Sequence, residues 1–321
     1  MKKKWLEQGY SDFANEGPDN LSVSRRNRTI VLGFLLLAPV LLLAQDVQPK
    51  VYAPAPTGVN LFTLGYAYSE GAMLFDRTIP VQNVNANIHS FNAAYSRSTA
   101  LFGKAGRFDV VVPLVRGTWE GEVLEEVQST SRFGIGDPVL RYALFISGAP
   151  ALSKQEFAGF QPKTIVGVTI RMTVPLGQYD ANNLINLGSN RWVFSPQVGV
   201  WHEIRNFTFE AYAGLWFFTD NKAFLGTQVR SQELLSSFQL HVSYSFPSGV
   251  WIAASSRQSL GGAVTVDDGD RLDPESNNRV GLTLSIPVGP RYSLKLLATT
   301  GLTTTIGNDY NTLSLVWQMV F

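Results

Sequence analysis

The sequence has no cysteine and little charge. The absence of cysteine among its 321 residues excludes disulfide bonds, thiolate metal sites and cysteine nucleophiles. Charged residues make up 16% of the chain, against about 25% in a typical soluble domain. The formal net charge of +1 gives no bulk electrostatic argument for an acidic partner. No basic stretch with interleaved aromatic residues is present either, so we expect no nucleic-acid partner.

Histidine is also scarce. The three histidines, His89, His202 and His241, lie far apart and show no metal-ligand spacing. We therefore expect no metal site, no cofactor and no catalytic residues. The densest acidic run, residues 267–275, lacks the alternating spacing of an EF-hand loop. We interpret this acidic run as a solvated loop. The alternative is that it weakly binds divalent ions that bridge it to anionic lipid.

Only one long apolar run occurs, at residues 29–43. Its length of about fifteen residues is short for a transmembrane helix, which needs about twenty. Three arginines precede it and Ala44 follows, which is typical of a secretory signal peptide. We predict that residues 1–44 form a signal peptide with a long polar first part, or a shorter one from a later start. An uncleaved anchor is the alternative.

The rest of the chain shows short alternating segments and no helical period. Residues 45–58 contain three prolines and are expected to form an extended periplasmic leader. Residues 59–321 are expected to form one all-β domain, an antiparallel transmembrane β-barrel of about twelve strands. The predicted strands are 59–69, 87–99, 107–118, 133–147, 164–175, 191–203, 207–219, 235–246, 250–260, 278–287, 292–303 and 310–321. Their connections alternate between short and long, except for 148–161, which is longer than expected.

Several strands place apolar and polar residues on opposite faces. In residues 235–246, phenylalanine, leucine, valine and tyrosine alternate with serine, glutamine and histidine. Charges in the middle of strands are costly in a sandwich core but not on the wet side of a barrel wall. A polar lumen is therefore expected, although the exposed face of a soluble antiparallel sheet is an alternative. The candidate lumen-lining residues are Lys163, Arg171, Glu210, Gln239, His241, Arg279, Lys295 and Gln318.

Aromatic residues make up 12% of the chain and cluster near predicted strand ends. Such positions are typical of aromatic girdles at the two membrane interfaces, although core packing is the alternative. The predicted interface aromatics are Trp119, Trp192, Trp216, Trp251, Trp317 and Phe321. We expect contact with outer-membrane lipid and lipopolysaccharide. The barrel-assembly machinery is expected to recognise the C-terminal strand that ends at Phe321.

Six short motifs carry a resemblance to a known family. They are Tyr-Ser-Glu-Gly at 68–71, Gly-Ile-Gly-Asp-Pro at 134–138, Val-Pro-Leu-Gly-Gln-Tyr-Asp at 174–180, Leu-Gly-Ser-Asn-Arg-Trp at 187–192, Trp-Phe-Phe-Thr-Asp-Asn at 216–221 and Leu-Val-Trp-Gln at 315–318. In these the chain resembles the bacterial family labelled as transporters of the MetA pathway of phenol degradation. The resemblance implies a Gram-negative outer-membrane β-barrel that admits aromatic or other apolar small molecules.

The motifs also have a local interpretation. The glycines and proline of 134–138 predict a kink or bulge in a curved wall. Asp180, Asn190, Arg191, Asp220 and Asn221 follow predicted strand ends. They are expected either to tie loops together, to contact lipopolysaccharide, or simply to cap local turns.

We expect a porin-like transporter in the outer membrane that gives a small solute passive passage, because no nucleotide-binding loop is present. A closed structural or assembly barrel is the first alternative. The second is an outer-membrane lipid hydrolase, for which His89 is the one candidate base. No serine motif supports it, so the chain is not expected to be an enzyme.

Overall fold

The computed structural model describes residues 47–74, 81–123, 126–183 and 185–321. The predicted signal peptide, 1–44, lies outside the described residues. Almost all regular structure is β. The strands are β1 (Asn60–Leu74), β2 (Val81–Leu101), β3 (Lys104–Val123), β4 (Glu126–Ile135), β5 (Val139–Ser147), β6 (Thr164–Thr173), β7 (Val193–Ile204), β8 (Phe207–Phe218), β9 (Asn221–Phe224), β10 (Gln228–Gln232), β11 (Leu235–Ser245), β12 (Trp251–Gly261), β13 (Val264–Val266), β14 (Glu275–Pro287), β15 (Tyr292–Thr303) and β16 (Gly307–Val320).

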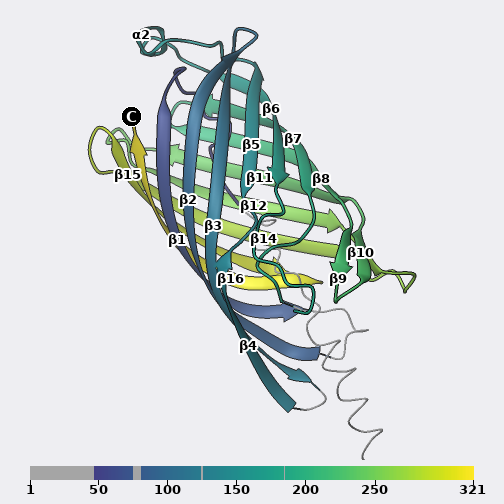
Figure 1. Cartoon of the computed structure of the whole chain (residues 1–321). Coiled ribbons are helices and arrows are strands. Elements are labelled where there is room, and N and C mark those ends of the chain that lie inside the picture. Colours follow the sequence, from purple (N-terminus) through teal and green to yellow (C-terminus); the bar gives the residue numbers. More distant parts are fainter. Residues whose placement is uncertain (1–46, 75–80, 124–125, 184) are drawn as a thin grey trace, which may run out of the picture.

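The long strands close into one antiparallel barrel (Figure 1). Each strand pairs with the next along the wall, and β16 pairs with β1 from Leu61↔Val320 to Leu74↔Gly307, which closes the cylinder. β4 and β5 pair with successive parts of β3 and together make one interrupted wall strand. β9, β10 and β13 form a separate small sheet. The wall therefore has twelve strands, and the predicted all-β barrel is confirmed.

The two ends of the barrel differ. At one end, called the short-turn end, tight turns join β2 to β3, β7 to β8, β11 to β12 and β14 to β15. The long connection after β5 also lies there and contains the one-turn helix α2 (Lys154–Phe157), capped by Ser153 and Glu156. At the opposite, long-loop end lie β4 and the β9–β10 hairpin (Figure 1). The C-terminus lies at the short-turn end.

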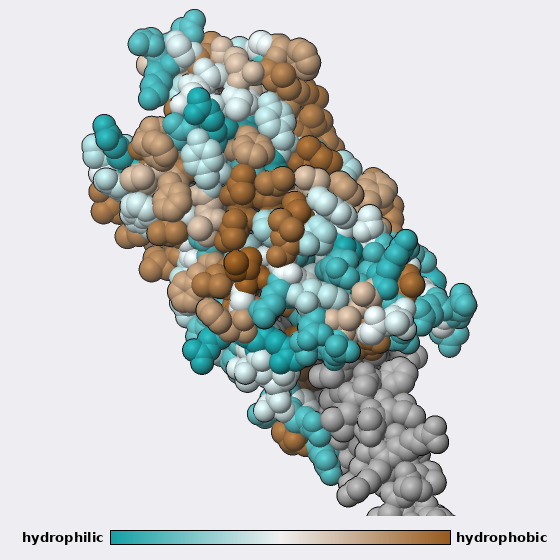
Figure 2. Space-filling model, in the orientation of Figure 1, coloured by the Kyte–Doolittle hydropathy of each residue, from teal (hydrophilic) through white to brown (hydrophobic). Residues whose placement is uncertain are grey.

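The barrel wall has an apolar outside because side chains alternate along each strand. In β11, Leu240 is 63% exposed while its neighbour His241 is 1% exposed. Figure 2 shows hydrophobic side chains gathered over the wall and hydrophilic ones over the β9–β10 region. The part of the chain that the structure describes contains no helix with the length and hydropathy needed to cross a bilayer.

The wall strand predicted at 133–147 is broken at Gly136, Asp137 and Pro138. Proline cannot donate to a strand ladder, and Gly136 instead donates its backbone N–H to the Pro113 carbonyl at 3.0 Å. Beyond this break β4 pairs with β3 alone, and the connection from β6 to β7 packs beside it. The predicted kink therefore frees Asp137 from the ladder and turns the chain towards that connection.

Candidate functional site

The barrel encloses a cavity of about 480 Å³. Its lining comes from β1, β2, β3, β5, β6, β7, β8, β12, β14, β15 and β16, from the break at Gly136 and Asp137, and from two further irregular segments. One is the segment before β1, called the plug and defined as residues 47–59. The other is the connection between β6 and β7, called the capping loop and defined as residues 174–192. The cavity lies between plug and capping loop, so both restrict it.

Tyr52 anchors the plug to the inner wall. Its side chain is fully buried, and its ring meets Tyr212 and Phe145 edge-on, with centroid distances of 5.2 and 6.1 Å. The hydroxyl shares a 2.9 Å hydrogen bond with the Thr169 hydroxyl and accepts one from Gln197 Nε2 at 3.2 Å. A buried tyrosine whose hydroxyl is satisfied gains from its apolar ring without a desolvation penalty.

A pair of glycines makes room for that ring. Gly167 and Gly199 are register partners on β6 and β7, and an added Cβ at either would collide with ring atoms of Tyr52. The Tyr52 ring thus lies directly on the backbone of these two glycines and fills the space that their side chains would otherwise occupy. Glycine in a strand interior often marks such a close approach.

The plug backbone is also hydrogen bonded to the wall. Lys50 donates its backbone N–H to Glu210 Oε2 at 2.9 Å, and Val51 donates to the Tyr212 hydroxyl at 3.2 Å. The Tyr212 hydroxyl in turn donates to the same Glu210 carboxylate. Glu210 therefore accepts one hydrogen bond from the plug directly and is linked to the plug a second time through Tyr212. These hydrogen bonds explain why a carboxylate can be buried at this position.

The plug is fixed again where it leaves the barrel. At the short-turn end, Thr57 donates its backbone N–H to the Leu152 carbonyl at 2.8 Å, and Ser98 Oγ donates to the Pro56 carbonyl at 2.5 Å. The segment expected to be an extended leader has turns at residues 51–52 and 57–58, and its first described residues, Val47 to Lys50, line the cavity inside the barrel. Sequence reasoning missed this because the contacts that hold Lys50, Val51 and Tyr52 inside the barrel join residues more than a hundred positions apart.

Asp137 holds the capping loop. It is 4% exposed. Its Oδ1 accepts from the Gly177 backbone N–H at 2.9 Å, and its Oδ2 accepts from the backbone N–H and the hydroxyl of Ser189 at 2.7 and 2.6 Å. Three motifs of the resemblance, 134–138, 174–180 and 187–192, therefore meet at this carboxylate. Charge-assisted hydrogen bonds of this kind are about twice as strong as neutral ones.

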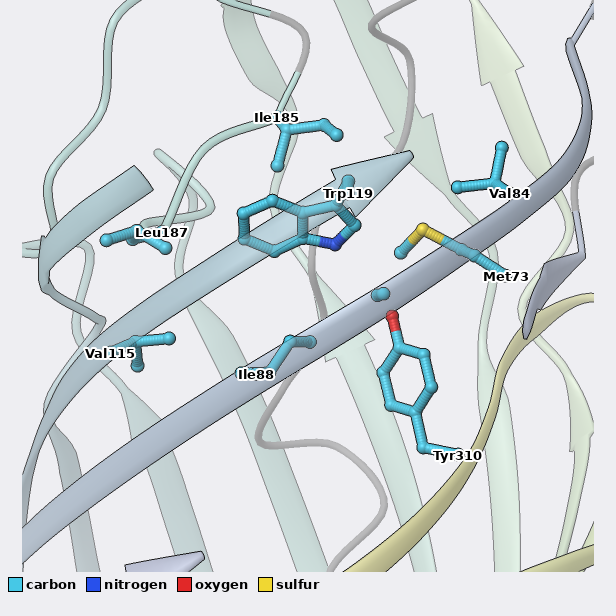
Figure 3. Packing of buried hydrophobic residues seen from close by; sticks show 9 residues of the cluster. Met73, Val84, Ile88, Val115, Trp119, Ile185, Leu187 and Tyr310 are labelled. Atoms are coloured by element: carbon cyan, nitrogen blue, oxygen red, sulfur yellow. The ribbon is translucent and has the colours of Figure 1, made fainter. Parts of the chain in front are cut away.

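The capping loop also has its own apolar contacts. Ile185 and Leu187 lie beside the indole of Trp119, and Val115, Ile88 and Tyr310 belong to the same buried cluster (Figure 3). The cluster joins the loop to β2, β3 and β16. The loop therefore packs against the inside of the wall at the long-loop end.

Three groups of cations mark the lumen. Asp109 accepts from both Arg141 Nε at 2.8 Å and Arg107 Nε at 3.2 Å. The guanidinium carbons of Arg171 and Arg257 lie 5.1 and 5.5 Å from the centroid of Trp216. Trp251 has the ammonium nitrogens of Lys50 and Lys295 within 4.5 and 5.4 Å of its centroid. The distances to Trp216 and to Trp251 are within the range of cation–π interactions.

Seven of the eight predicted lumen residues fall into three groups. Arg171, Arg279, Lys295 and Gln318 line the cavity. Gln239 lines a smaller pocket behind the plug, with Arg171 and Trp216. Glu210 and His241 face inward and are buried, and the His241 Nδ1 shares a 2.8 Å hydrogen bond with the Ser255 hydroxyl. Lys163 differs: it is exposed in the turn before β6 and lies outside the cavity, because the strand starts only at Thr164.

Three of the predicted interface aromatics point inward instead. Trp119 and Trp216 are 2% and 6% exposed, and Trp251 lines the cavity. They fill the lumen or bind its cations rather than form a girdle. Trp192 and Phe321 are exposed, and Trp317 packs outside against Phe62 and Tyr292. The sequence signal for the difference is strand parity.

The long-loop end carries buried cations of its own. Burial lowers the pKa of the Arg191 guanidinium well below its ordinary value, and neighbouring Arg230 acts in the same direction. Burial lowers the pKa of Arg230 to about 10. Arg191 lies over the Phe218 ring at 4.6 Å and donates to Gln232. At the surface, hydrogen bonds from Arg271 lower the pKa of Glu233.

Among the residues proposed as loop ties or turn caps, some join separate segments and others make local turn contacts. Asn190 Nδ2 donates to Asn221 Oδ1 at 2.8 Å and joins the capping loop to β9. Asp180 instead accepts from the Asn182 backbone N–H at 2.9 Å, which is a local turn contact. Asp220 accepts from the Ser231 hydroxyl at 2.7 Å.

His89 lies among aromatic side chains. Its Nδ1 shares a 2.8 Å hydrogen bond with the Tyr66 hydroxyl, and its ring is 5.1 Å from that of Tyr68. Across the described residues, no group of three or more histidine, aspartate or glutamate side chains could hold a metal ion.

The closed wall, apolar outside and polar lumen define the fold of an outer-membrane β-barrel channel. The family described as "Putative MetA-pathway of phenol degradation" matches residues 75–317, and the chain belongs to this family. No functionally curated protein matches it.

Among solved structures, the COG4313 outer membrane channel from Pseudomonas putida F1 is similar at a TM-score of 0.68 and 20% identity. That match covers 86% of this chain and all of the other. The KdgM porin matches at a TM-score of 0.42 and 6% identity, covering 81% and 99% of the two chains. The beta domain of the Bordetella autotransporter BrkA matches at 0.46 and 10%, covering 82% and 100%.

Proposed function

We propose that this chain is a passive outer-membrane channel for a small solute, and that its plug and capping loop restrict passage. The observation that carries the proposal is the cavity of about 480 Å³ between these two segments. Its volume lies in the range of small-molecule sites, about 300–1,000 Å³. The family description and the apolar part of the lining favour an aromatic or other apolar solute. Passage would be driven by the concentration gradient.

A closed structural barrel is the second candidate, because Val51 and Tyr52 of the plug pack into a buried cluster with aromatic side chains of the wall. Swelling of liposomes that contain the purified protein separates the two candidates. Entry of small sugars or aromatic solutes supports a channel. No entry in the native protein or in a plug variant, Tyr52→Ala, would support the closed barrel and contradict the channel.

Reversing the charge of a cavity residue tests whether ions pass it. In planar bilayers under a salt gradient, Arg171→Glu and Lys295→Glu should each lower the anion-to-cation permeability ratio severalfold, because a charge within a few ångströms changes the local ion energy by about 1 kcal/mol or more. Lys163→Glu makes the same charge change outside the cavity and should leave the ratio unchanged. Unchanged selectivity in both cavity variants would contradict a conducting path through this cavity.

A further inference from the structure

The cavity carries an unequal number of charges. Its lining contains the six cations Lys50, Arg107, Arg141, Arg171, Arg279 and Lys295 but only two carboxylates, Asp109 and Asp137. Both carboxylates are already engaged. Asp109 binds Arg107 and Arg141, and Asp137 accepts three hydrogen bonds from the capping loop. The cavity therefore has an excess of positive charge in a confined space, where charges interact more strongly than in water.

The excess is concentrated at the short-turn end. Lys295 lies near the start of β15 and Trp251 begins β12, so both follow tight turns, and Lys50 belongs to the plug. The two ammonium groups share the Trp251 ring. Among described residues Lys295 has no hydrogen bond or ion pair, and the charged groups that act on it, Arg107 and Lys50, are both cations.

The positive charge of Lys50 is partly balanced by nearby carboxylates, but its ammonium group forms no ion pair among the described residues. Its Nζ donates weakly to Ser245 Oγ at 3.4 Å, and Glu210 and Glu203 act on it through space. The carboxylate of Glu210 is turned to the Lys50 backbone and to Tyr212. Two ammonium groups near one ring repel each other, and an anion between them would remove that repulsion.

Apolar surface lies next to these cations. Val316 is the register partner of Lys295 on β16, Leu297 lies on the same inner face of β15, and both line the cavity with Trp251. A ligand that meets this surface and the ammonium groups together needs an apolar body and one negative charge.

We propose that the cavity binds a small amphiphilic organic anion, with its carboxylate between Lys50 and Lys295 and its apolar body against Trp251, Leu297 and Val316. The inference deepens the proposed function, on which it rests for its biological role, because it names the class of solute that the channel accepts. Binding itself can be measured whether or not the solute passes.

The test is isothermal titration of the purified full chain in detergent with four probes. Benzoate has the ring and the negative charge, benzyl alcohol has the ring alone, benzylammonium reverses the charge, and acetate has the charge alone. Benzoate should bind about tenfold more tightly than each of the others, which is the scale expected for one charge-assisted contact.

Variants locate the site. Lys295→Gln should weaken benzoate binding about tenfold and leave benzyl alcohol unchanged, whereas Lys295→Arg should retain most of the affinity. Lys50→Gln provides a second variant outside the barrel wall, so its effect does not depend on barrel assembly. Lys163→Gln removes a cation outside the cavity and should have no effect. Heat-modifiable migration on gels shows that each variant is folded.

Equal binding of benzoate and benzyl alcohol, no benzoate binding, or unchanged affinity in both Lys295→Gln and Lys50→Gln would overturn the inference. The liposome assay reports separately on passage. Benzoate binding without solute entry would contradict the channel and support the anion site. Solute entry without preferential benzoate binding would support the channel and contradict the anion site.

Discussion

At the scale of single residues, the lumen is organised by aromatic rings lying on glycine. Tyr52 lies on Gly167 and Gly199, and Trp119 lies over Gly117, where an added Cβ would meet the indole. Each ring covers bare backbone of the wall and ties an inner segment to it. The plug and the capping loop therefore depend on the absence of a side chain at these wall positions.

Gly199→Ala should release the plug. The added Cβ would collide with the Tyr52 ring, and overpacking of this kind costs about 1–3 kcal/mol. The ring should leave its position, and single-channel conductance in planar bilayers should rise severalfold. Tyr52→Ala should raise it similarly, and the double variant should behave like Tyr52→Ala alone because both changes act on one contact.

Gly65→Ala is the matched control. It lies on β1, and its added Cβ would be 3.6 Å from Val316, an ordinary contact. Conductance should stay at the native level in this variant. Additive effects of Gly199→Ala and Tyr52→Ala would show that the glycine does not act through the ring.

The direction of most side chains could be predicted from parity, because residues two positions apart on a strand share a face. Trp216 has the same parity as Glu210 on β8, and Trp251 the same as Arg257 on β12, so mid-strand charges already mark both tryptophans as inward. Their position near strand ends suggested a girdle instead. Lys163 has inward parity but precedes its strand, and no local pattern fixes a strand boundary within a residue or two.

At the scale of elements, the break between β4 and β5 turns a wall strand into a support for the capping loop. The Gly-Ile-Gly-Asp-Pro motif predicted a kink, and the kink is present. Its partner could not be predicted, because Asp137 reaches Gly177 and Ser189 across 40 and 52 positions of sequence. The plug is similar: three prolines predicted an extended chain, but its location depends on distant contacts with β6, β7 and β8.

Asp137→Ala should loosen the capping loop without unfolding the barrel. The change removes three hydrogen bonds to a carboxylate, and such bonds contribute about 1.5–3 kcal/mol each. Chymotrypsin added to intact proteoliposomes should then cleave near Tyr179 about tenfold faster or more. Single-channel recordings should also show more frequent fluctuations.

Asp220→Ala is the control for that prediction. Asp220 also accepts a hydrogen bond at the long-loop end, from the Ser231 hydroxyl, but among the described residues its side chain makes no hydrogen bond to the capping loop. Cleavage near Tyr179 should be as slow in this variant as in the native protein. Native-like protection in Asp137→Ala would mean that the apolar cluster around Trp119 holds the loop by itself.

At the scale of the whole molecule, the scarcity of charge and the alternation of side chains have one cause, a wall with lipid outside and a wetter interior. Closure from β16 back to β1 removes free strand edges, which a membrane cannot tolerate. This level of structure was the easiest to predict, because every strand repeats the same period of two. The contents of the lumen were the hardest, because they are set by segments that share no period with the wall.

The same reasoning predicts opposite environments for adjacent residues of one strand. On β16, Leu315 is 47% exposed on the outside, while Ser314 lines the cavity. The chain has no cysteine, so Leu315→Cys and Ser314→Cys each carry a nitroxide spin label at one site. In lipid vesicles, the label at 315 should collide mainly with oxygen, which concentrates in lipid, and the label at 314 mainly with a water-soluble nickel chelate. Leu313→Cys, two residues from 315 on the same face, should repeat the result at 315. Equal oxygen accessibility at 314 and 315 would mean that β16 does not separate lipid from a wetter lumen, and the barrel orientation of this strand would be wrong.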